Sequence, residues 1–371
     1  SKRAEERGTA MQRRFSVAAL GGKVATVLAT AACGPATGTS VGGAADTPEA
    51  RVARFYRGNT IRIMVGYTPG GGFDTYSRLL ARHLGKYVPG QPNVVVENHP
   101  GNGSLKIANA VYKELPKDGT IIGSFNENSI LLQLLDRPGI EFDARRYQWL
   151  GSMNDSPSVC AFRTDSPATS FQDLLDGVEV TIATDSPGST SYDTPNTLNA
   201  ALGLNLRLVT GYGGTGPSRL AVDRKETDGA CWTWESMSVT ARPWFESDPP
   251  TARVLVVLGD MVPSHPWLKD AVPAAAYAPT PREQGMIMAM ATPSQIGKPF
   301  AVAPEVPEER VAALRAAFEQ AVADPDLLAD AARFHMQVTP RGGAEVSERV
   351  GRILSLPDDV RAALKAMATP Q

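Results

Sequence analysis

Short apolar runs alternate with helical patterns along most of this chain, and no other feature constrains its fold as strongly. The predicted elements of a first series are strands at 60–66, 93–97 and 120–124 and helices at 73–87 and 106–114. Those of a second series are strands at 179–183, 206–210 and 228–232 and helices at 192–202 and 217–224. Strand–helix–strand order with short glycine-rich joints is typical of parallel sheets covered by helices on both faces. The sequence therefore predicts an α/β protein.

The two series are separated by a long connection, residues 148–162, and this separation indicates two lobes. We expect residues 51–152 and 255–371 to form lobe 1 and residues 153–254 to form lobe 2, each a mainly parallel sheet flanked by helices. A further strand at 253–258 would lie near the return crossing. The predicted C-terminal helices, which should pack on lobe 1, are 306–323, 325–334, 343–354 and 357–367.

The first 50 residues have the layout of an export segment followed by a flexible tether. From Met11 the chain has a basic head, an apolar stretch and small residues that lead to Cys33, as in a secretory signal. Cys33 is the predicted lipidation site, and an ordinary peptide cleaved near Ala32 is the alternative. The apolar part is far shorter than the ~20 residues that a spanning helix needs. We therefore expect a periplasmic or other extracytoplasmic protein that contacts the membrane only through a lipid anchor.

Composition excludes several classes of function. The chain has 371 residues and a formal net charge of -2, so no general attraction to nucleic acid is expected. Four histidines and three cysteines show no metal-ligand spacing, and nothing marks a catalytic triad. We predict no metal, no cofactor and no enzymatic activity, and we expect a monomer. Export would allow Cys160 and Cys231 to pair, but two free buried thiols are the favoured interpretation.

A glycine-rich loop follows the first strand and precedes a helix. Its bare backbone would let a ligand approach the main chain, and exposed N–H groups at the helix start attract an anion. No lysine followed by serine or threonine is present, so the loop is not a phosphate-binding P-loop. Asp74 has helix capping as an alternative role. The candidate ligand-binding residues of this loop are Tyr67, Thr68, Pro69, Gly70, Gly71, Gly72, Phe73 and Asp74.

Three further segments follow predicted strands, beyond their carboxyl ends, where ligands of open α/β sheets bind. The loop at 184–191 offers hydroxyls at a helix start, with plain capping as the alternative. Trp232 would wall a pocket or fill the core between the lobes. The candidate residues of these segments are Asn126, Asn128, Thr184, Ser186, Gly188, Ser189, Thr190, Ser191 and Trp232.

A Gly-x-Gly-x-x-Gly pattern occurs at Gly211, Gly213 and Gly216, after a predicted strand. Glu235 lies roughly where a ribose-binding carboxylate belongs, so spacing alone does not dismiss a dinucleotide site. The pattern belongs to the second series, however, and the first series has a different loop. This position disfavours a dinucleotide site, so a nucleotide-dependent α/β enzyme is only an alternative.

Several segments together resemble the Bug-type periplasmic solute receptors of tripartite tricarboxylate transporters. The likeness covers about residues 55–370. It rests on VGYTPGGGFDTYSRLLARHL, VVVENHPGNGSLKIAN, LPKDGTIIGSFNENS, DSPGSTSYDTPNTLNAALG, VTGYGGTGPSRLAVDRKETDG and VPEERVAALRAAFEQAVADPDLLADA. The resemblance implies a two-lobed, type II-like Venus-flytrap fold that closes on a small organic anion. It also implies that N–H groups near 68–73 bind a ligand carboxylate and that residues 186–191 supply opposing contacts.

The resulting functional expectation is a receptor that captures a small carboxylate and delivers it to a membrane permease. The chain departs from the family pattern at Gly72-Phe73, at Lys106 and at Glu235. If Glu235 faces the cleft, it would repel a carboxylate unless the ligand also carries an amine. A ligand sensor that presents to a membrane kinase is the other alternative.

Overall fold

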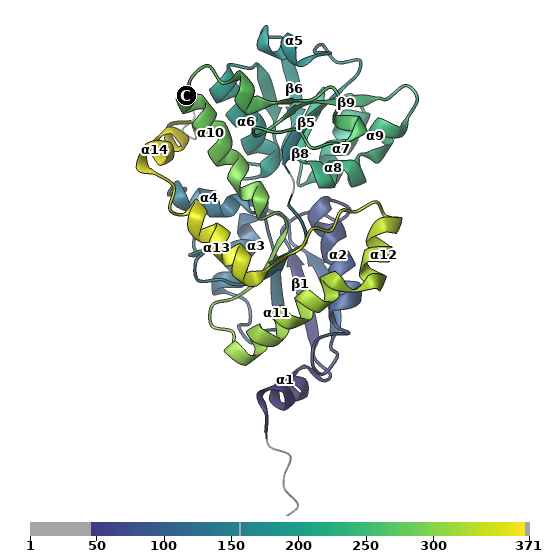
Figure 1. The fold of residues 1–371 in the computed structure, drawn as a ribbon, viewed down its shortest axis with the longest axis vertical. Helices are drawn as coiled ribbons and strands as arrows, with labels where there is room; N and C mark the ends of the chain where they lie inside the picture. The colour runs from purple at the N-terminus through teal and green to yellow at the C-terminus, as the bar shows by residue number, and fades with distance from the viewer. Residues whose placement is uncertain (1–45, 156, 368–371) are drawn as a thin grey trace, which may run out of the picture. The chain divides into compact units, whose positions relative to one another are not determined.

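Two six-stranded sheets organise the part of the chain that the structure describes, residues 46–155 and 157–367 of a computed structural model (Figure 1). The strand orders are β12-β4-β11-β3-β1-β2 and β10-β9-β5-β8-β6-β7. We call each sheet, with the helices packed on it, a lobe. The predicted signal segment and the lipidation site at Cys33 lie outside the described residues.

The first lobe contains the N-terminal series and most of the C-terminal helices. Its strands are β1 (Thr60–Val65), β2 (Asn93–Asn98), β3 (Ile121–Ser124), β4 (Gln148–Ser152), β11 (Pro299–Val302) and β12 (Arg341–Gly342). Its helices are α1 (Pro48–Tyr56), α2 (Gly72–Leu84), α3 (Leu105–Lys113), α4 (Asn128–Leu134), α11 (Glu308–Ala323), α12 (Pro325–Arg333) and α13 (Gly343–Ile353), with a 3-10 turn η1 (Asn102–Ser104). Fully buried Ile61 and Ile63 of β1 pack with Leu79 and Leu80 of α2, so the apolar face of α2 covers this sheet.

The second lobe has the same plan. Its strands are β5 (Ser158–Arg163), β6 (Val180–Ala183), β7 (Leu206–Val209), β8 (Gly229–Thr233), β9 (Ala252–Val257) and β10 (Val272–Pro273). Its helices are α5 (Phe171–Leu175), α6 (Thr190–Leu202), α7 (Thr215–Asp223), α8 (Trp234–Thr240), α9 (Arg242–Glu246) and α10 (Pro281–Ala291), with 3-10 turns η2 (Pro266–Leu268), η3 (Ala274–Tyr277) and η4 (Thr292–Gln295). The last helix, α14 (Asp358–Met367), packs on α10, and its Arg361 and Lys365 also form ion pairs with Asp136, which follows α4 of the first lobe (Figure 1).

Both sheets are mixed, and in the second sheet the parallel pairs, which include β9 with β10, outnumber the antiparallel ones. β1 pairs in parallel with β2 and β3, and β6 pairs in parallel with β7 and β8. β11, by contrast, is antiparallel to β3 and β4, and β5 is antiparallel to β8 and β9. The antiparallel strands β5 and β11 come directly after the chain has crossed from the other lobe, so they enter their sheets in the opposite direction. Local hydrophobic patterns carry no information on this direction.

The predicted connection at 148–162 contains two strands, one in each lobe. β4 belongs to the first sheet and β5 to the second, so the chain crosses in the few residues between them. The return crossing also differs from the prediction. All of β9 pairs in the second sheet and α10 packs on α6, so the chain returns through η4, just before β11. A lobe boundary at residue 254 would cut through β9.

Cys160 and Cys231 form a disulfide, so the prediction of two free thiols is wrong. Cys160 on β5 lies opposite Cys231 on β8 in the antiparallel register, and their Cα atoms are 4.1 Å apart. Cysteines whose Cα atoms are more than about 7 Å apart cannot bond without backbone movement, so this strand pairing is what brings the two sulfurs together. The pairing depends on strand register, which the sequence does not reveal.

Among the described residues, the structure contains no helix with both the length and the apolar character needed to cross a membrane.

Candidate functional site

Four helices of the described chain begin around one small cavity between the lobes. α2 follows β1 in the first lobe, while α6, α7 and α8 follow β6, β7 and β8 in the second. The first N–H groups of a helix have no partner within the helix, and the helix dipole makes this end positive. Helix starts from both lobes therefore give the cavity a positive potential without a lysine or arginine in its lining.

The cavity has a volume of about 40 Å³. Its lining consists of Tyr67, Gly71, Gly72, Phe73 and Asn126 from the first lobe and Ser189, Thr190, Ser191, Gly214, Thr215, Trp232, Thr233 and Ser236 from the second. Gly214, Thr215, Thr233 and Ser236 are the lining residues that the sequence analysis missed. The first two lie in the glycine-rich loop that was weighed as a nucleotide motif, and the other two lie one and four residues after Trp232.

Direct hydrogen bonds between the lobes close this cavity. The main-chain N–H of Gly72 donates to Thr215 Oγ1 at 3.3 Å, and Asn126 Nδ2 donates to Thr190 Oγ1 at 3.0 Å. Thr68 donates to the Gly213 carbonyl from its main-chain N–H at 3.3 Å and from its hydroxyl at 3.2 Å. The structure is therefore a closed conformation in which the lobes touch around the helix starts.

The glycines of the first loop allow this close approach. A Cβ atom placed on Gly72 would lie 1.8 Å from Ser236 Oγ, and one placed on Gly71 would lie 2.8 Å from Thr215 Oγ1. Both partner atoms belong to the opposite lobe. Side chains at either position would hold the lobes apart. Glycine at these positions therefore allows the lobes to close, and it also lets a ligand reach the main chain.

The remaining candidate residues of the first loop lie outside the cavity lining. Buried Asp74 accepts hydrogen bonds from the Gly70 N–H at 2.9 Å and from Arg78 and Asn98. Burial would raise the pKa of Asp74, but these donors hold it below its ordinary value. Asp74 thus supports the turn at Gly70, whereas the N-cap of α2 is Gly71 and has no side-chain capping hydrogen bond. Pro69 is likewise absent from the lining.

The other candidates outside the lining organise the second loop and the contact between the lobes. The Thr184 hydroxyl donates to the Val209 carbonyl at 3.2 Å and joins β6 to β7. The Ser186 carbonyl accepts from the Ser189 hydroxyl at 2.7 Å. Asp193 accepts from the Gly188 N–H at 3.1 Å and, across the lobes, from Asn128 Nδ2 at 3.4 Å.

Three buried ionisable side chains lie near the cavity. Lys298, directly before β11, forms an ion pair with Glu235 in the first turn of α8. Burial lowers the pKa of Lys298 to about 8, while the attraction of Glu127 opposes this change. Burial also raises the pKa of Glu127 to about 7, against the attraction of Lys298. The charge of Glu235 is thus offset by an ammonium group, so it does not repel a ligand carboxylate as an isolated charge would.

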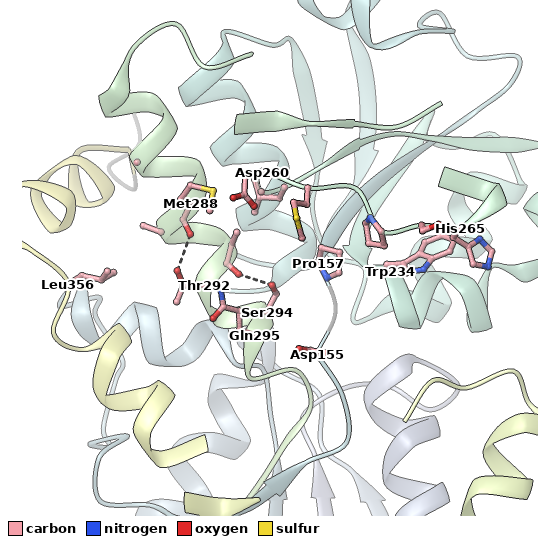
Figure 2. Close-up of a pocket in the computed structure, with 18 of the residues that line it drawn as sticks. Asp155, Pro157, Trp234, Asp260, His265, Met288, Thr292, Ser294, Gln295 and Leu356 are labelled. Atoms are coloured by element: carbon pink, nitrogen blue, oxygen red, sulfur yellow. Dashed lines mark hydrogen bonds between the residues drawn. The ribbon is translucent and has the colours of Figure 1, made fainter. Parts of the chain in front are cut away.

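A larger cavity of about 640 Å³ lies beside the segments that cross between the lobes (Figure 2). Asp155 and Asp260 contribute carboxylates to its lining, and Met288 and Leu356 are among its apolar residues. Among the described residues no lysine or arginine lines it, and of the four helix starts around the smaller cavity only that of α8 contributes, through Trp234. Its carboxylates disfavour an anion, so the smaller cavity is the better anion site.

Within the described ranges 46–155 and 157–367, no group of three or more histidine, cysteine, aspartate or glutamate side chains is arranged to hold a metal ion.

Comparisons with known proteins agree with this fold. No family model matches the chain. A stretch of 91 residues is 36% identical to the UPF0065 protein in gbd 5'region of Cupriavidus necator; it covers 24% of this chain and about a quarter (27%) of that relative. The solved structure of the periplasmic binding protein BugD has 18% identity and a TM-score of 0.65, covering 82% of this chain and 98% of BugD.

MatC from Rhodopseudomonas palustris, solved with bound malate, is a second similar structure. It has 21% identity and a TM-score of 0.65, and the match covers 82% of this chain and 99% of MatC. At these identities the likeness shows the fold. The prediction of a two-lobed α/β binding-protein fold is therefore confirmed.

Proposed function

We propose that this protein is an extracytoplasmic solute-binding receptor that captures a small organic carboxylate between its two lobes. The observation that carries the proposal is the convergence of helix starts from both lobes on one closed cavity. Malate in the structure of MatC, which shares this fold, supports the same class of ligand.

The chemistry of capture follows from the cavity lining. Carboxylate oxygens would accept hydrogen bonds from main-chain N–H groups at the starts of α2 and α6 and from the hydroxyls of Thr190 and Thr215. Preorganised dipoles of this kind stabilise an anion without a paired cation. The closed cavity of about 40 Å³ is small, so the ligand enters a more open form and the lobes then close over it.

The same packing disfavours a dinucleotide. Gly213 and Gly214 of the Gly-x-Gly-x-x-Gly segment lie against Thr68 of the other lobe, and the start of α7 faces Gly72. The space in front of this segment is the cavity of about 40 Å³, and a ligand of two nucleotides would keep Thr68 from returning to Gly213 when the lobes close. Binding without chemical conversion is the function that this site supports best.

Isothermal titration with malate, succinate, citrate, adipate and aspartate, set against NAD, tests the proposal. We expect saturable heats with at least one carboxylate and none with NAD. Trp232 lines the cavity, so its fluorescence should change with the same ligands. Binding of NAD with no response to any carboxylate would overturn the proposal.

Delivery to a membrane permease and attachment through Cys33 are further parts of the proposal. A transporter gene beside the gene for this protein would support delivery, whereas a neighbouring kinase gene would support the sensor alternative. Mass spectrometry of the membrane fraction tests the attachment, since absence of an acyl mass on Cys33 would remove it.

A further inference from the structure

Two hydroxyls of the cavity lining have their hydrogens directed away from the ligand space. Ser236 Oγ donates to Glu235 Oε1 at 3.0 Å, and Thr233 Oγ1 donates to the same oxygen at 2.8 Å. A hydroxyl has one hydrogen and two lone pairs. Because each hydrogen is already engaged, Ser236 and Thr233 can offer a ligand only lone pairs.

Buried partners fix this direction. The Lys298 ammonium also donates to Glu235 Oε1, and it donates a second hydrogen bond, of 3.4 Å, to Thr233 Oγ1. An ionised carboxylate accepts only and an ammonium donates only, so neither hydroxyl can turn its hydrogen outward without losing a bond. Ser236, Glu235 and Lys298 are at most 2% exposed, so bulk water offers no replacement partner.

Other groups of the cavity lining can donate hydrogen bonds to a ligand. Thr190 Oγ1 accepts from Asn126 Nδ2, and Thr215 Oγ1 accepts from the Gly72 N–H. Neither hydroxyl donates a hydrogen bond within the described residues, so both hydrogens remain for a ligand. Trp232 lines the same cavity, and its buried indole N–H has no acceptor among the described residues. Together with the helix starts, these donors suit carboxylate oxygens.

We propose that the site selects carboxylates that also carry a hydrogen-bond donor, a hydroxyl or ammonium group, and that Ser236 and Thr233 recognise this donor because Glu235 orients them. The inference rests on the proposed function and adds the class of ligand. A carboxylate without such a group supplies no donor to the accepting lone pairs of these two hydroxyls, or places an oxygen against them. A hydroxy or amino acid satisfies both kinds of lining group at once.

Titration of the full-length protein with malate and succinate tests the inference, because the two differ by one hydroxyl. Sites built to bond a ligand hydroxyl reject the analogue that lacks it, often by large factors. We expect malate or aspartate to bind at least about tenfold more tightly than succinate. In Ser236→Ala and in the near-isosteric Thr233→Val, this ratio should fall toward one while the affinity for succinate changes little.

Glu235→Gln provides a second variant with a different expected result. A carboxamide can donate to Ser236, which frees the serine hydrogen to turn toward the cavity. The preference for malate over succinate should then shrink or reverse. Circular dichroism spectra matching the wild type would show that each variant is folded.

The outcomes separate this inference from the proposed function. Equal binding of malate, aspartate and succinate by the wild type overturns the inference and leaves the receptor function intact. A preference that survives unchanged in Ser236→Ala and Thr233→Val also overturns it. Failure of every carboxylate to bind overturns the proposed function itself.

Discussion

The ammonium group of Lys298 and the carboxylate of Glu235 form a buried ion pair that joins the two lobes. Lys298 directly precedes β11 of the first sheet, and Glu235 lies in the first turn of α8 on the second. Their side chains are 2% and 1% exposed. Removing one partner of such a pair leaves a buried charge uncompensated, which makes the pair important for stability and for lobe closure.

Lys298→Met should lower the free energy of unfolding by about 3–5 kcal/mol, because it leaves Glu127 and Glu235 as buried carboxylates without their cation. The double variant Lys298→Met/Glu235→Gln should recover part of this loss. Urea denaturation at neutral pH measures both. Lys113→Met, which removes an exposed ion pair with Glu141, is the matched control and should change little. A loss in Lys298→Met no larger than in the control would contradict the prediction.

Glu127 should make stability depend on pH. Burial raises its pKa from 4.5 to about 7, so the folded protein retains a proton that the unfolded chain releases. This contribution to stability is complete below about pH 4.5 and is lost as the pH rises through about 7. In the variant Glu127→Gln, the carboxamide that replaces this carboxyl group does not titrate. The unfolding free energy of wild type minus that of the variant should therefore decrease steadily from about pH 5 to pH 8.

Urea midpoints at several pH values provide this measurement. Asp185 and Asp193, whose pKa values burial raises to about 6, titrate in both proteins and so cancel in the difference, whereas Lys298, whose pKa burial lowers and Glu127 raises, adds to the decrease. A difference that stays constant with pH would show that Glu127 does not titrate in this range.

Gly72→Ala should weaken ligand binding without unfolding the protein. The added Cβ would lie 1.8 Å from Ser236 Oγ of the opposite lobe, so the closed form would have to open. We expect the affinity for the best carboxylate to fall by about tenfold or more, as titration calorimetry would show. Gly216→Ala is the control, because the nearest atom to its Cβ is the Pro69 carbonyl oxygen at 3.7 Å, an ordinary contact. Equal affinities of the two variants would refute the steric argument.

Loss of the disulfide should reduce stability more than it reduces binding. Cys160 and Cys231 are separated by 71 residues, and closing a long loop in the unfolded chain removes much of its entropy. Cys160→Ala/Cys231→Ala should therefore lower the free energy of unfolding by roughly 2–4 kcal/mol. Melting temperatures of the variant and of the wild type, each with and without reductant, measure the effect. A variant that melts at the wild-type temperature would contradict it.

Much of the fold and part of the site follow from local sequence. Strands such as β1 and helices such as α2 were predicted within a few residues, because apolar periodicity and glycine-rich joints act over short distances. The loops that hold Gly72 and Thr190 were found for the same reason, since helix starts after strands are local features. The structure brings these two loops to one cavity.

Relationships between distant residues required the tertiary structure. Lys298 is 63 residues from Glu235, and nothing in its surrounding sequence marks it as a partner. The pairing of Cys160 with Cys231, the antiparallel entry of β11 and the contact of Gly72 with Ser236 depend in the same way on register and on where the chain crosses. The sequence by itself therefore determined most of the elements and the loops of the candidate site. Only the tertiary structure decided which charges are buried together and which way the hydroxyls point, because those follow from packing between segments far apart in the chain.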